Sequence, residues 1–475
     1  MPPGQSYRLP EAILAFPGEN AMPALCAGIA FSRSFLGHLF EFRTMRPVTS
    51  APMSALPRGL PGYIALLRGN PNVRNLWAAQ SVSQLGDWFN SVALLGLIIS
   101  LTNSPISASL TVVFQMLPAA VTSVFIGGYI ADRYDRKKVM IAADIARAII
   151  ALSFILIRSP EWVWVAYAGT LLLSVGSAFF DPATAAALPN LCRPGELMTA
   201  NALQQSTWAS GVFVGAALGG VVAQVFGRDA AFVINALSFL WSAYFLSRIR
   251  GRFRADDGPI ALAGASALRV LTDGFRFLQH HPRVLMISLA KPIWALTLGG
   301  IGLYSVYAFN VYGVGDIGTS WLYAGRGLGA FVGPLVMTSL FAPKAPREFV
   351  RVLGLTFLLC SFGYLVFGLS QSPVIGALGL AIGHFGGGSV WAFSRIFVQR
   401  ETPDSLRGRV LAVDGMGFSV VTSLSTLVVG TIATAATPAA GILSGVGATL
   451  VTGVLWVLVV WALTRERPGI VNRPV

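Results

Sequence analysis

The sequence predicts an all-α membrane protein with twelve transmembrane helices in two bundles of six, and three observations lead to this fold class. Hydrophobic residues make up 54% of the 475 residues and charged residues only 11%, which is typical of a chain that lies mostly in lipid. Apolar runs near the length of about 20 residues that one span requires recur twelve times. A polar stretch at 247–283 divides these runs into six and six.

Each expected span lies between breaks formed by glycine, proline or charged residues. The first six spans are expected at 76–101, 106–131, 139–157, 163–180, 200–226 and 231–246. The second six are expected at 284–307, 318–340, 350–369, 374–393, 410–433 and 439–463. They define bundles at 73–250 and 284–465, joined by a central loop at 251–283. Prolines crowd residues 1–72, which predicts a disordered cytoplasmic extension, and 466–475 form a cytoplasmic tail.

Arginine and lysine predict the orientation, because short loops rich in these residues stay on the cytoplasmic side. One side collects Arg133 to Lys138, Arg193, the arginines from 248 to 254, Lys344, Arg347, Arg400, Arg407, Arg409, Arg465 and Arg467. The opposite side holds only Arg158 and Arg228. Both termini are therefore expected in the cytoplasm and the protein in the inner (plasma) membrane. The net charge of +14 is thus explained by topology and requires no nucleic acid as a partner.

Motifs of enzymes and cofactor proteins are missing from the sequence. The chain has no GxxxxGK[ST] phosphate-binding loop, no HExxH motif and no paired CxxC. Its three cysteines, Cys26, Cys192 and Cys360, are isolated, which argues against a disulfide framework and a zinc site. We therefore expect no enzyme, no catalytic residue, no metal site and no cofactor.

A short charged loop, GYIADRYDRKKVM at 128–140, separates two apolar runs. It resembles the G-x-L-A-D-R-x-G-R-R/K loop between helices 2 and 3 of major facilitator transporters, with Ile130 in place of Leu and Asp135 in place of the second Gly. The resemblance extends from Asn72 to Arg467 and is closest to the drug and siderophore exporter branch, which includes macrolide-efflux and enterobactin-export proteins. The segments QSVSQLGDWFNSVAL at 80–94, FFDPATAAALPNL at 179–191 and ETPDSLRGRVLAV at 401–413 carry it further.

The resemblance implies a latch between the two bundles on the cytoplasmic side. Asp132 is expected to face the positive N-terminal end of the helix that begins near Val410, and Arg136 to pair with Asp181. The remaining members of the expected latch are Gly128, Arg133, Lys137 and Arg409. The alternative is that these charges serve only as topology signals.

Small residues line one face of the fifth span. Glycines four apart predict close helix packing there, and the set comprises Gly211, Gly215, Gly219 and Gly220. The spacing resembles the antiporter motif G-x-x-x-G-P-x-x-G-G, although Ala216 replaces the proline. A general packing face explains the glycines almost as well.

Charged residues inside spans are costly, so each is a functional candidate. Asp87 lies midway through the first span and is the candidate for proton coupling, with a structural hydrogen bond as the alternative.

The other charges in the spans are expected to differ in their partners. Asp144 and Arg147 are one turn apart and are expected to pair. Asp414 is expected to contact Arg407 or Arg409, near the start of the eleventh span. The remaining two intramembrane charges, Lys291 and Arg326, have no evident acidic partner in the sequence. They suggest a cavity that tolerates anions. The alternative for Arg326 is that it only supports the packing of the glycine-rich helix around it.

Aromatic and amide side chains accompany these charges. Large amphipathic ligands bind mainly through apolar contacts and a few directed polar groups, and aromatic and amide side chains can supply both. The candidates for the substrate cavity are Trp88, Asn90, Phe114, Gln115, Gln204, Gln205, Trp208, Tyr304 and Tyr307.

Together these features predict a secondary transporter that exports a hydrophobic or amphipathic small molecule in exchange for protons, by alternating access. Its expected partners are that small molecule, protons and the lipid bilayer, and it is expected to act as a monomer. The alternatives are uptake or lipid translocation by the same fold, or a membrane sensor that transports nothing.

Overall fold

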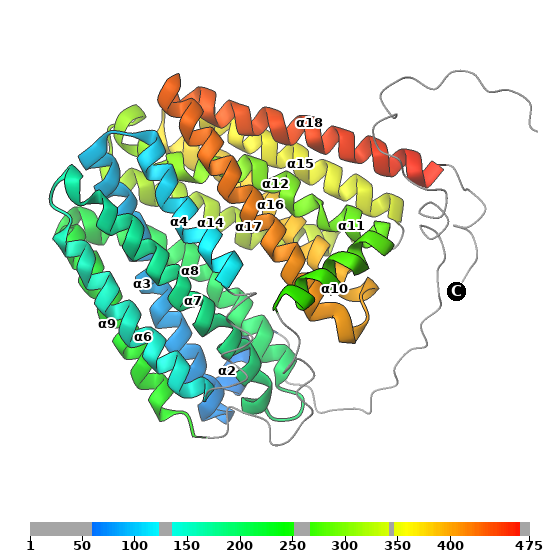
Figure 1. Ribbon diagram of the computed structural model, residues 1–475, viewed down its shortest axis with the longest axis horizontal. Helices are drawn as coiled ribbons and strands as arrows, with labels where there is room; N and C mark the ends of the chain where they lie inside the picture. Colours follow the sequence, from blue (N-terminus) through cyan, green and yellow to red (C-terminus); the bar gives the residue numbers. More distant parts are fainter. Residues whose placement is uncertain (1–58, 123–134, 251–266, 342–345, 466–475) are drawn as a thin grey trace, which may run out of the picture.

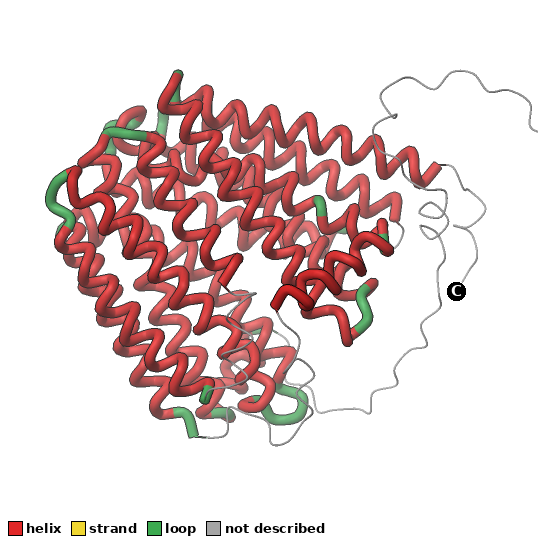
Figure 2. Tube along the Cα trace, viewed as in Figure 1, coloured by secondary structure: helices red, strands yellow, loops and turns green. Residues whose placement is uncertain are grey.

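The computed structural model describes residues 59–122, 135–250, 267–341 and 346–465, and these residues form helices and short connections without any strand (Figure 2). Six long helices build the first half of the chain: α3 (Pro71–Thr102), α4 (Pro105–Thr122), α6 (Arg136–Ser153), α7 (Val163–Leu191), α8 (Leu197–Phe226) and α9 (Arg228–Arg248). Short 3-10 turns, η2 (Phe154–Leu156) and η3 (Pro160–Trp162), connect α6 to α7.

The second half begins with a broken rod. It consists of α11 (Pro282–Ser288), α12 (Ala290–Leu298), the 3-10 segment η4 (Gly299–Leu303), α13 (Tyr304–Val306) and the π-helical segment η5 (Tyr307–Val311). Glycines at 299, 300 and 302 favour the irregular stretch. Five long helices follow: α14 (Gly315–Leu340), α15 (Pro346–Leu369), α16 (Pro373–Glu401), α17 (Asp404–Ala435) and α18 (Pro438–Arg465).

Local sequence signals explain where these helices begin. Asn70 caps α3, because its side chain accepts hydrogen bonds from the backbone N–H groups of Asn72 and Val73, and Pro71 occupies the first helical position. Asp135 caps α6 in the same way, accepting from the backbone N–H groups of Lys137 and Lys138. The residue that departs from the family loop pattern at 135 is therefore a helix cap.

Ten helical rods in the described part of the chain are long and apolar enough to cross a membrane. The broken rod from Pro282 to Val311 is one of these ten. The 26-residue α14 is not among them, and α4 contributes a shorter apolar stretch at Pro105–Pro118. An all-helical fold with apolar rods of membrane-spanning length is thus confirmed for the described residues, whereas the number of twelve spans stays a prediction.

The rods have two ends, which we name after residues that lie there. At the Lys137 end, the Lys137 ammonium group donates to the carbonyl oxygens of Ser247 and Ile249, at 2.9 Å each. At the Arg228 end, the same half of the chain places Arg158 against Asp229. In Figure 1 the two halves converge at the upper left, where the Arg228 end lies, and run apart from there.

Two helix pairs form most of the contact between the halves: α8 packs on α14, and α4 packs on α17. Glycines permit the close approach. A Cβ atom at Gly220 of α8 would lie 2.7 Å from the carbonyl oxygen of Asp316, and one at Gly327 of α14 would lie 2.7 Å from the backbone nitrogen of Phe213. Gly430 of α17 similarly faces the side chain of Ser109 in α4.

Two segments that the sequence assigned to disorder or a loop are helical. Helix α2 (Leu60–Gly69) lies within the extension predicted as disordered at 1–72, and it packs on α3 and α8 with Leu66 buried. Helix α10 (Ala267–His280) lies within the predicted loop at 251–283 and packs on α17. Both are shorter than a membrane span, so a search for spans overlooks them.

Candidate functional site

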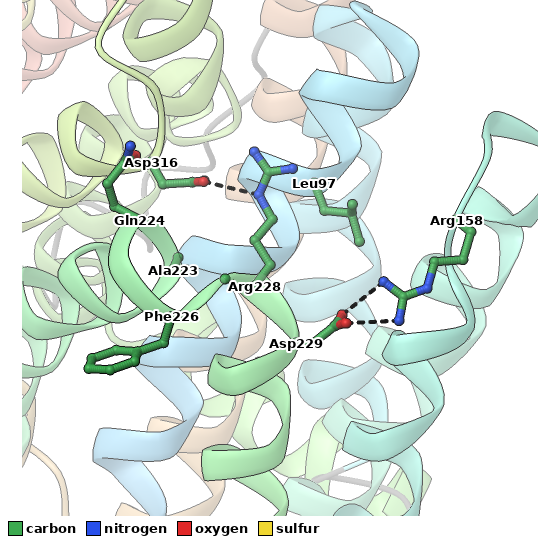
Figure 3. Close-up of a pocket in the computed structure, with 9 residues that line it drawn as sticks. Leu97, Arg158, Ala223, Gln224, Phe226, Arg228, Asp229 and Asp316 are labelled. Carbon is green, nitrogen blue, oxygen red and sulfur yellow. Dashed lines mark hydrogen bonds and ion pairs between the residues drawn. The ribbon is translucent and has the colours of Figure 1, made fainter.

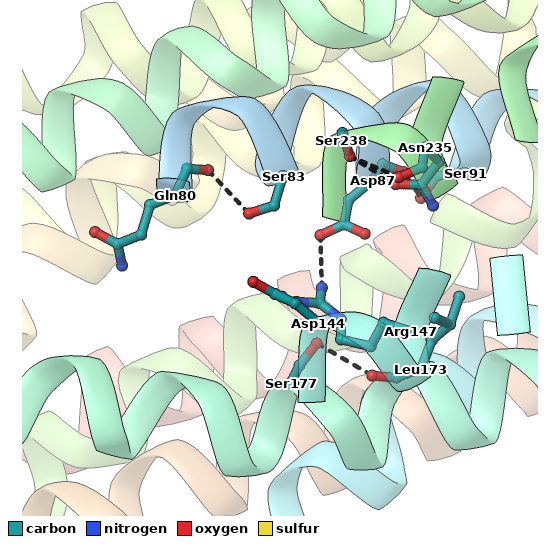
Figure 4. A network of polar contacts seen from close by, with 10 residues as sticks. All are labelled: Gln80, Ser83, Asp87, Ser91, Asp144, Arg147, Leu173, Ser177, Asn235 and Ser238. Atoms are coloured by element: carbon teal, nitrogen blue, oxygen red, sulfur yellow. Dashed lines mark hydrogen bonds and ion pairs between the residues drawn. The ribbon is translucent and has the colours of Figure 1, made fainter. Parts of the chain in front are cut away.

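A buried charge cluster joins α3 to α6 in the first half (Figure 4). The Arg147 guanidinium donates to the Asp87 carboxylate at 2.9 Å and to the Asp144 carboxylate at 3.4 Å. The side chains of Arg147 and Asp144 are 6% and 0% exposed, while that of Asp87 is 39% exposed. Asp87 is therefore the least buried member of the cluster.

The surrounding helices hold Arg147 in place. Its guanidinium carbon lies 4.0 Å from the centre of the Phe239 ring in α9, within cation–π range. Its aliphatic stem passes Gly176 of α7, where a Cβ atom would approach the Arg147 Cγ to 2.8 Å. Asp144 and Arg147 stand three residues apart on α6, which places both on one face. The sequence indicated this pair, but not that Asp87 shares the same guanidinium.

A second buried pair lies in the second half. Lys291 of α12 forms an ion pair with Asp414 of α17, with side chains 3% and 1% exposed. The Lys291 ammonium also lies 4.6 Å from the centre of the Trp391 ring.

This pairing corrects two expectations. Lys291 does have an acidic partner, 123 residues away in the sequence. The ion-pair partner of Asp414 is Lys291 and not Arg409, which is near it in the sequence. Arg409 instead forms an ion pair with Asp273 of α10 at 2.6 Å, and the Arg407 Nε donates to the carbonyl of Gln399. These contacts lie within the second half, so Arg409 bridges no gap between the halves.

An ion pair that the sequence did not reveal joins the two halves at the Arg228 end (Figure 3). The Arg228 Nε donates to the Asp316 carboxylate at 3.0 Å, and its Nη1 donates to the Ser100 hydroxyl at 2.7 Å. The side chain of Arg228 is 22% exposed and that of Asp316 is 8% exposed. The neighbouring pair of Arg158 and Asp229 stands on the surface and borders the same cavity of about 440 Å³.

Glycines and helix starts position this pair. Arg228 is the first residue of α9 and follows Gly227, whose φ of 84° favours glycine. Asp316 lies in the first turn of α14, where a carboxylate is stabilised by the helix dipole. The Asp316 side chain packs against Gly96 of α3. A Cβ atom at Gly96 would lie 1.8 Å from the Asp316 Oδ1. The only sequence signal was the isolation of Arg228 at an end with few charges.

Two further hydrogen bonds cross between the halves at the same end. Asn310 donates to the side chain of Asn103 at 2.9 Å, and the backbone N–H of Ile106 donates to the Thr434 hydroxyl at 3.0 Å. Together with the pair of Arg228 and Asp316, these bonds connect the two halves at this end. The Arg228 end is thus closed.

The expected cytoplasmic latch lies mostly outside the described residues. Gly128, Asp132 and Arg133 fall in the gap at 123–134, and the side chain of Asp181 is not described either. Arg136 is the first residue of α6. Lys137 bonds to backbone carbonyls of its own half.

The expected glycine face packs as predicted for close helices. A Cβ atom at Gly215 would lie 3.0 Å from that of Trp88, and one at Gly219 would lie 3.0 Å from the Phe89 Cα, so α8 and α3 approach closely. Gly211 has more room, since its nearest neighbour is 3.5 Å away in the side chain of Gln84.

The cavity candidates occupy different environments. Trp88 lies at the contact between the halves, with its ring centre 5.8 Å from that of Tyr323. Phe114 stacks on Tyr167 at 5.4 Å, and Gln204 donates to Gln80. Of the rest, Asn90 is buried, whereas Gln115 and Trp208 are exposed. The side chain of Gln205 lies outside the described part.

Tyr304 and Tyr307 belong to the core of the second half and do not line a cavity, which corrects the expectation. Their residues are 0% and 2% exposed. The Tyr304 hydroxyl bonds with that of Tyr364 at 2.8 Å, and the Tyr307 hydroxyl donates to the carbonyl of Gly368 at 2.6 Å. Tyrosine is compatible with either a cavity or a core, so its type alone could not separate them.

Known proteins resemble the chain in sequence. The Major Facilitator Superfamily profile matches residues 76–426. The enterobactin exporter EntS of Shigella boydii is 27% identical over 85% of this chain and 95% of its own length. The putative bacilysin exporter BacE of Bacillus subtilis is 25% identical over 75% of this chain and 87% of its own length. The uncharacterized MFS-type transporter YfiS of the same species is 31% identical, but only 56% of its length is matched.

Solved structures show the same fold. A bacterial homologue of the human lysosomal transporter Spinster aligns with a TM-score of 0.66 and 15% identity over 85% of this chain and 98% of its own. A peptide transporter POT aligns with a TM-score of 0.67 and 13% identity over 87% and 97%. The family that the charged loop predicted is therefore confirmed: the chain belongs to the Major Facilitator Superfamily and is a multi-pass membrane transporter.

Proposed function

We propose that the protein exports a hydrophobic or amphipathic small molecule from the cell and takes up protons in exchange. Two relatives that match most of the chain are named as exporters, one of enterobactin and one of bacilysin. In this proposal the Lys137 end faces the cytoplasm, in agreement with the positive charge of its loops. The membrane is the inner (plasma) membrane, and the protein acts as a monomer.

The observation that carries proton exchange is the unequal charge count of the first-half cluster. Asp87 and Asp144 supply two carboxylates, while Arg147 supplies one guanidinium. With all three ionised the cluster carries one negative charge, and a single proton neutralises it. An uncompensated charge is destabilising away from water. Binding of one proton would therefore stabilise this cluster. The pair of Lys291 and Asp414 has no net charge when both residues are ionised, so a proton gives it no such stabilisation.

Alternating access would proceed by rocking of the two halves. The contacts between Arg228 and Asp316 and between Asn103 and Asn310 close the Arg228 end in this structure. Opening that end requires these contacts to break. The latch of Asp132, Arg136 and Asp181 would then close the Lys137 end in the opposite state.

Replacing Asp87 with Asn tests the exchange. Asn cannot release a proton, so we expect respiring everted membrane vesicles to lose the proton efflux that substrate addition causes, measured as recovery of quenched acridine fluorescence. The probes are rhodamine 6G and dansylglycine, a cationic and an anionic amphipath. Accumulation of a probe inside the vesicles marks export.

Asp229→Asn is the matched control, because Asp229 forms an exposed pair that lies outside the cluster. It should leave the fluorescence recovery unchanged. Equal recovery in wild type and Asp87→Asn would place the proton carrier elsewhere.

A further inference from the structure

We propose that Arg326 forms the anion-binding subsite of the transport cavity, and that the preferred substrate carries a carboxylate or similar negative group next to an aromatic ring. This inference rests on the proposed transport function and names the substrate class within it. It follows from the position, surroundings and missing counter-ion of Arg326.

Arg326 lies near the middle of α14, at the contact between the halves. Its guanidinium carbon is 5.9 Å from the centre of the Trp88 ring in α3 and 5.7 Å from that of Tyr323, one turn earlier on α14. The residue is partly exposed. One wall of the site thus comes from the first half and the other from the second.

A hydrogen-bonded group lies behind this wall. The Tyr364 hydroxyl bonds to the His384 Nε2 at 3.0 Å and to the Tyr304 hydroxyl at 2.8 Å. These three groups are two phenols and an imidazole, and none of them is a carboxylate. The described side chains that lie near Arg326 are therefore aromatic and polar.

Three other cations among the described residues, Arg147, Lys291 and Arg228, have a carboxylate partner. Arg147 contacts Asp87 and Asp144, and Lys291 pairs with Asp414. Arg228 pairs with Asp316. In contrast, no described acidic residue forms an ion pair with Arg326, and none of the side-chain hydrogen bonds among the described residues involves it.

A guanidinium in the partly buried contact between the halves is destabilising without a counter-ion, and its five N–H donors need acceptors. Because the side chain is partly exposed, water can supply these acceptors, and an anionic ligand supplies them together with the missing charge. A planar carboxylate matches the guanidinium fork, while the partly exposed ring of Trp88 offers a face for an aromatic group. Such a ligand touches both halves, so its binding can bias their relative position.

Two fluorescent probes of nearly equal shape separate charge recognition from apolar binding: dansylglycine, which is anionic, and its neutral amide. Binding is measured with the full-length protein in lipid nanodiscs, without any gradient. We expect the wild type to prefer dansylglycine. Arg326→Gln should weaken dansylglycine binding at least about tenfold and leave binding of the amide unchanged.

Arg326→Lys keeps the charge and should retain part of the preference for dansylglycine. Arg193→Gln removes an exposed cation at the Lys137 end and serves as the control, with both affinities unchanged. Equal affinity of the wild type for the two probes, binding of neither, or an equal loss of both in Arg326→Gln would overturn the proposal. The last result would assign Arg326 a purely structural role.

The binding assay also keeps this proposal distinct from the proposed transport function. Selective binding of dansylglycine without any proton exchange in vesicles would contradict proton antiport and support the subsite. Equal proton exchange with dansylglycine and with its neutral amide, without selective binding of dansylglycine, would contradict the subsite and support antiport.

Discussion

Asp316→Asn is expected to open the Arg228 end and to lower export at least about tenfold. The substitution leaves the charge of Arg228 at a site where the side chain is only 22% exposed, without its carboxylate partner. Removing one partner of a partly buried pair costs about 1–3 kcal/mol, and 1.4 kcal/mol changes an equilibrium tenfold. The closed state loses this stabilisation, so the population shifts towards the open one.

Accessibility of a buried position measures this shift. Ser320 is fully buried where α14 meets Gly220 of α8. A cysteine placed there, in protein without the native cysteines, should react with a membrane-impermeant maleimide from outside the cell faster in the Asp316→Asn background.

Exchange of the two charges, Arg228→Asp together with Asp316→Arg, should restore slow labelling and part of the export. Asp229→Asn disrupts a pair whose side chains are 61% and 47% exposed, and it should change neither quantity. Slow labelling in Asp316→Asn would show that this ion pair does not hold the end closed.

Lys291→Met should have the largest effect on stability. The substitution leaves the Asp414 carboxylate, 1% exposed, without a counter-charge. Breaking a buried pair in this way costs about 3–5 kcal/mol, whereas replacing both partners with neutral groups is far less harmful. We therefore expect thermal unfolding in detergent at a temperature lower by at least about 5 °C.

The double variant Lys291→Met with Asp414→Asn should regain most of the lost thermal stability. A double variant as unstable as Lys291→Met would assign the loss to packing of the lysine stem against Trp391 rather than to the unpaired charge.

The fold was largely predictable because lipid imposes a strong constraint on sequence. Backbone polar groups must be satisfied within each helix, so spans appear as long apolar runs. The expected span at 439–463 corresponds to α18 (Pro438–Arg465), and that at 350–369 to α15 (Pro346–Leu369). The short helices α2 and α10 carry no such signal, although apolar residues at helical spacing on one face of α10 are typical of an amphipathic helix.

The charge clusters were predictable only within one helix. Asp144 and Arg147 stand three residues apart, and helical periodicity alone places them together. The other pairings join residues that are 60 to 136 apart in sequence: Asp87 with Arg147, Arg228 with Asp316, Lys291 with Asp414, and Asp273 with Arg409. Such partners depend on how the helices pack, and periodicity contains no information about that.

Distances between spin labels test alternating access most directly. Labels at residues 161 and 371 report on the Arg228 end, and labels at the exposed positions 201 and 400 report on the Lys137 end. On going from wild type to Asp316→Asn, the distance between 161 and 371 should increase while that between 201 and 400 decreases. Distances that change in the same direction at both ends, or at neither, would contradict alternating access by rocking of the two halves.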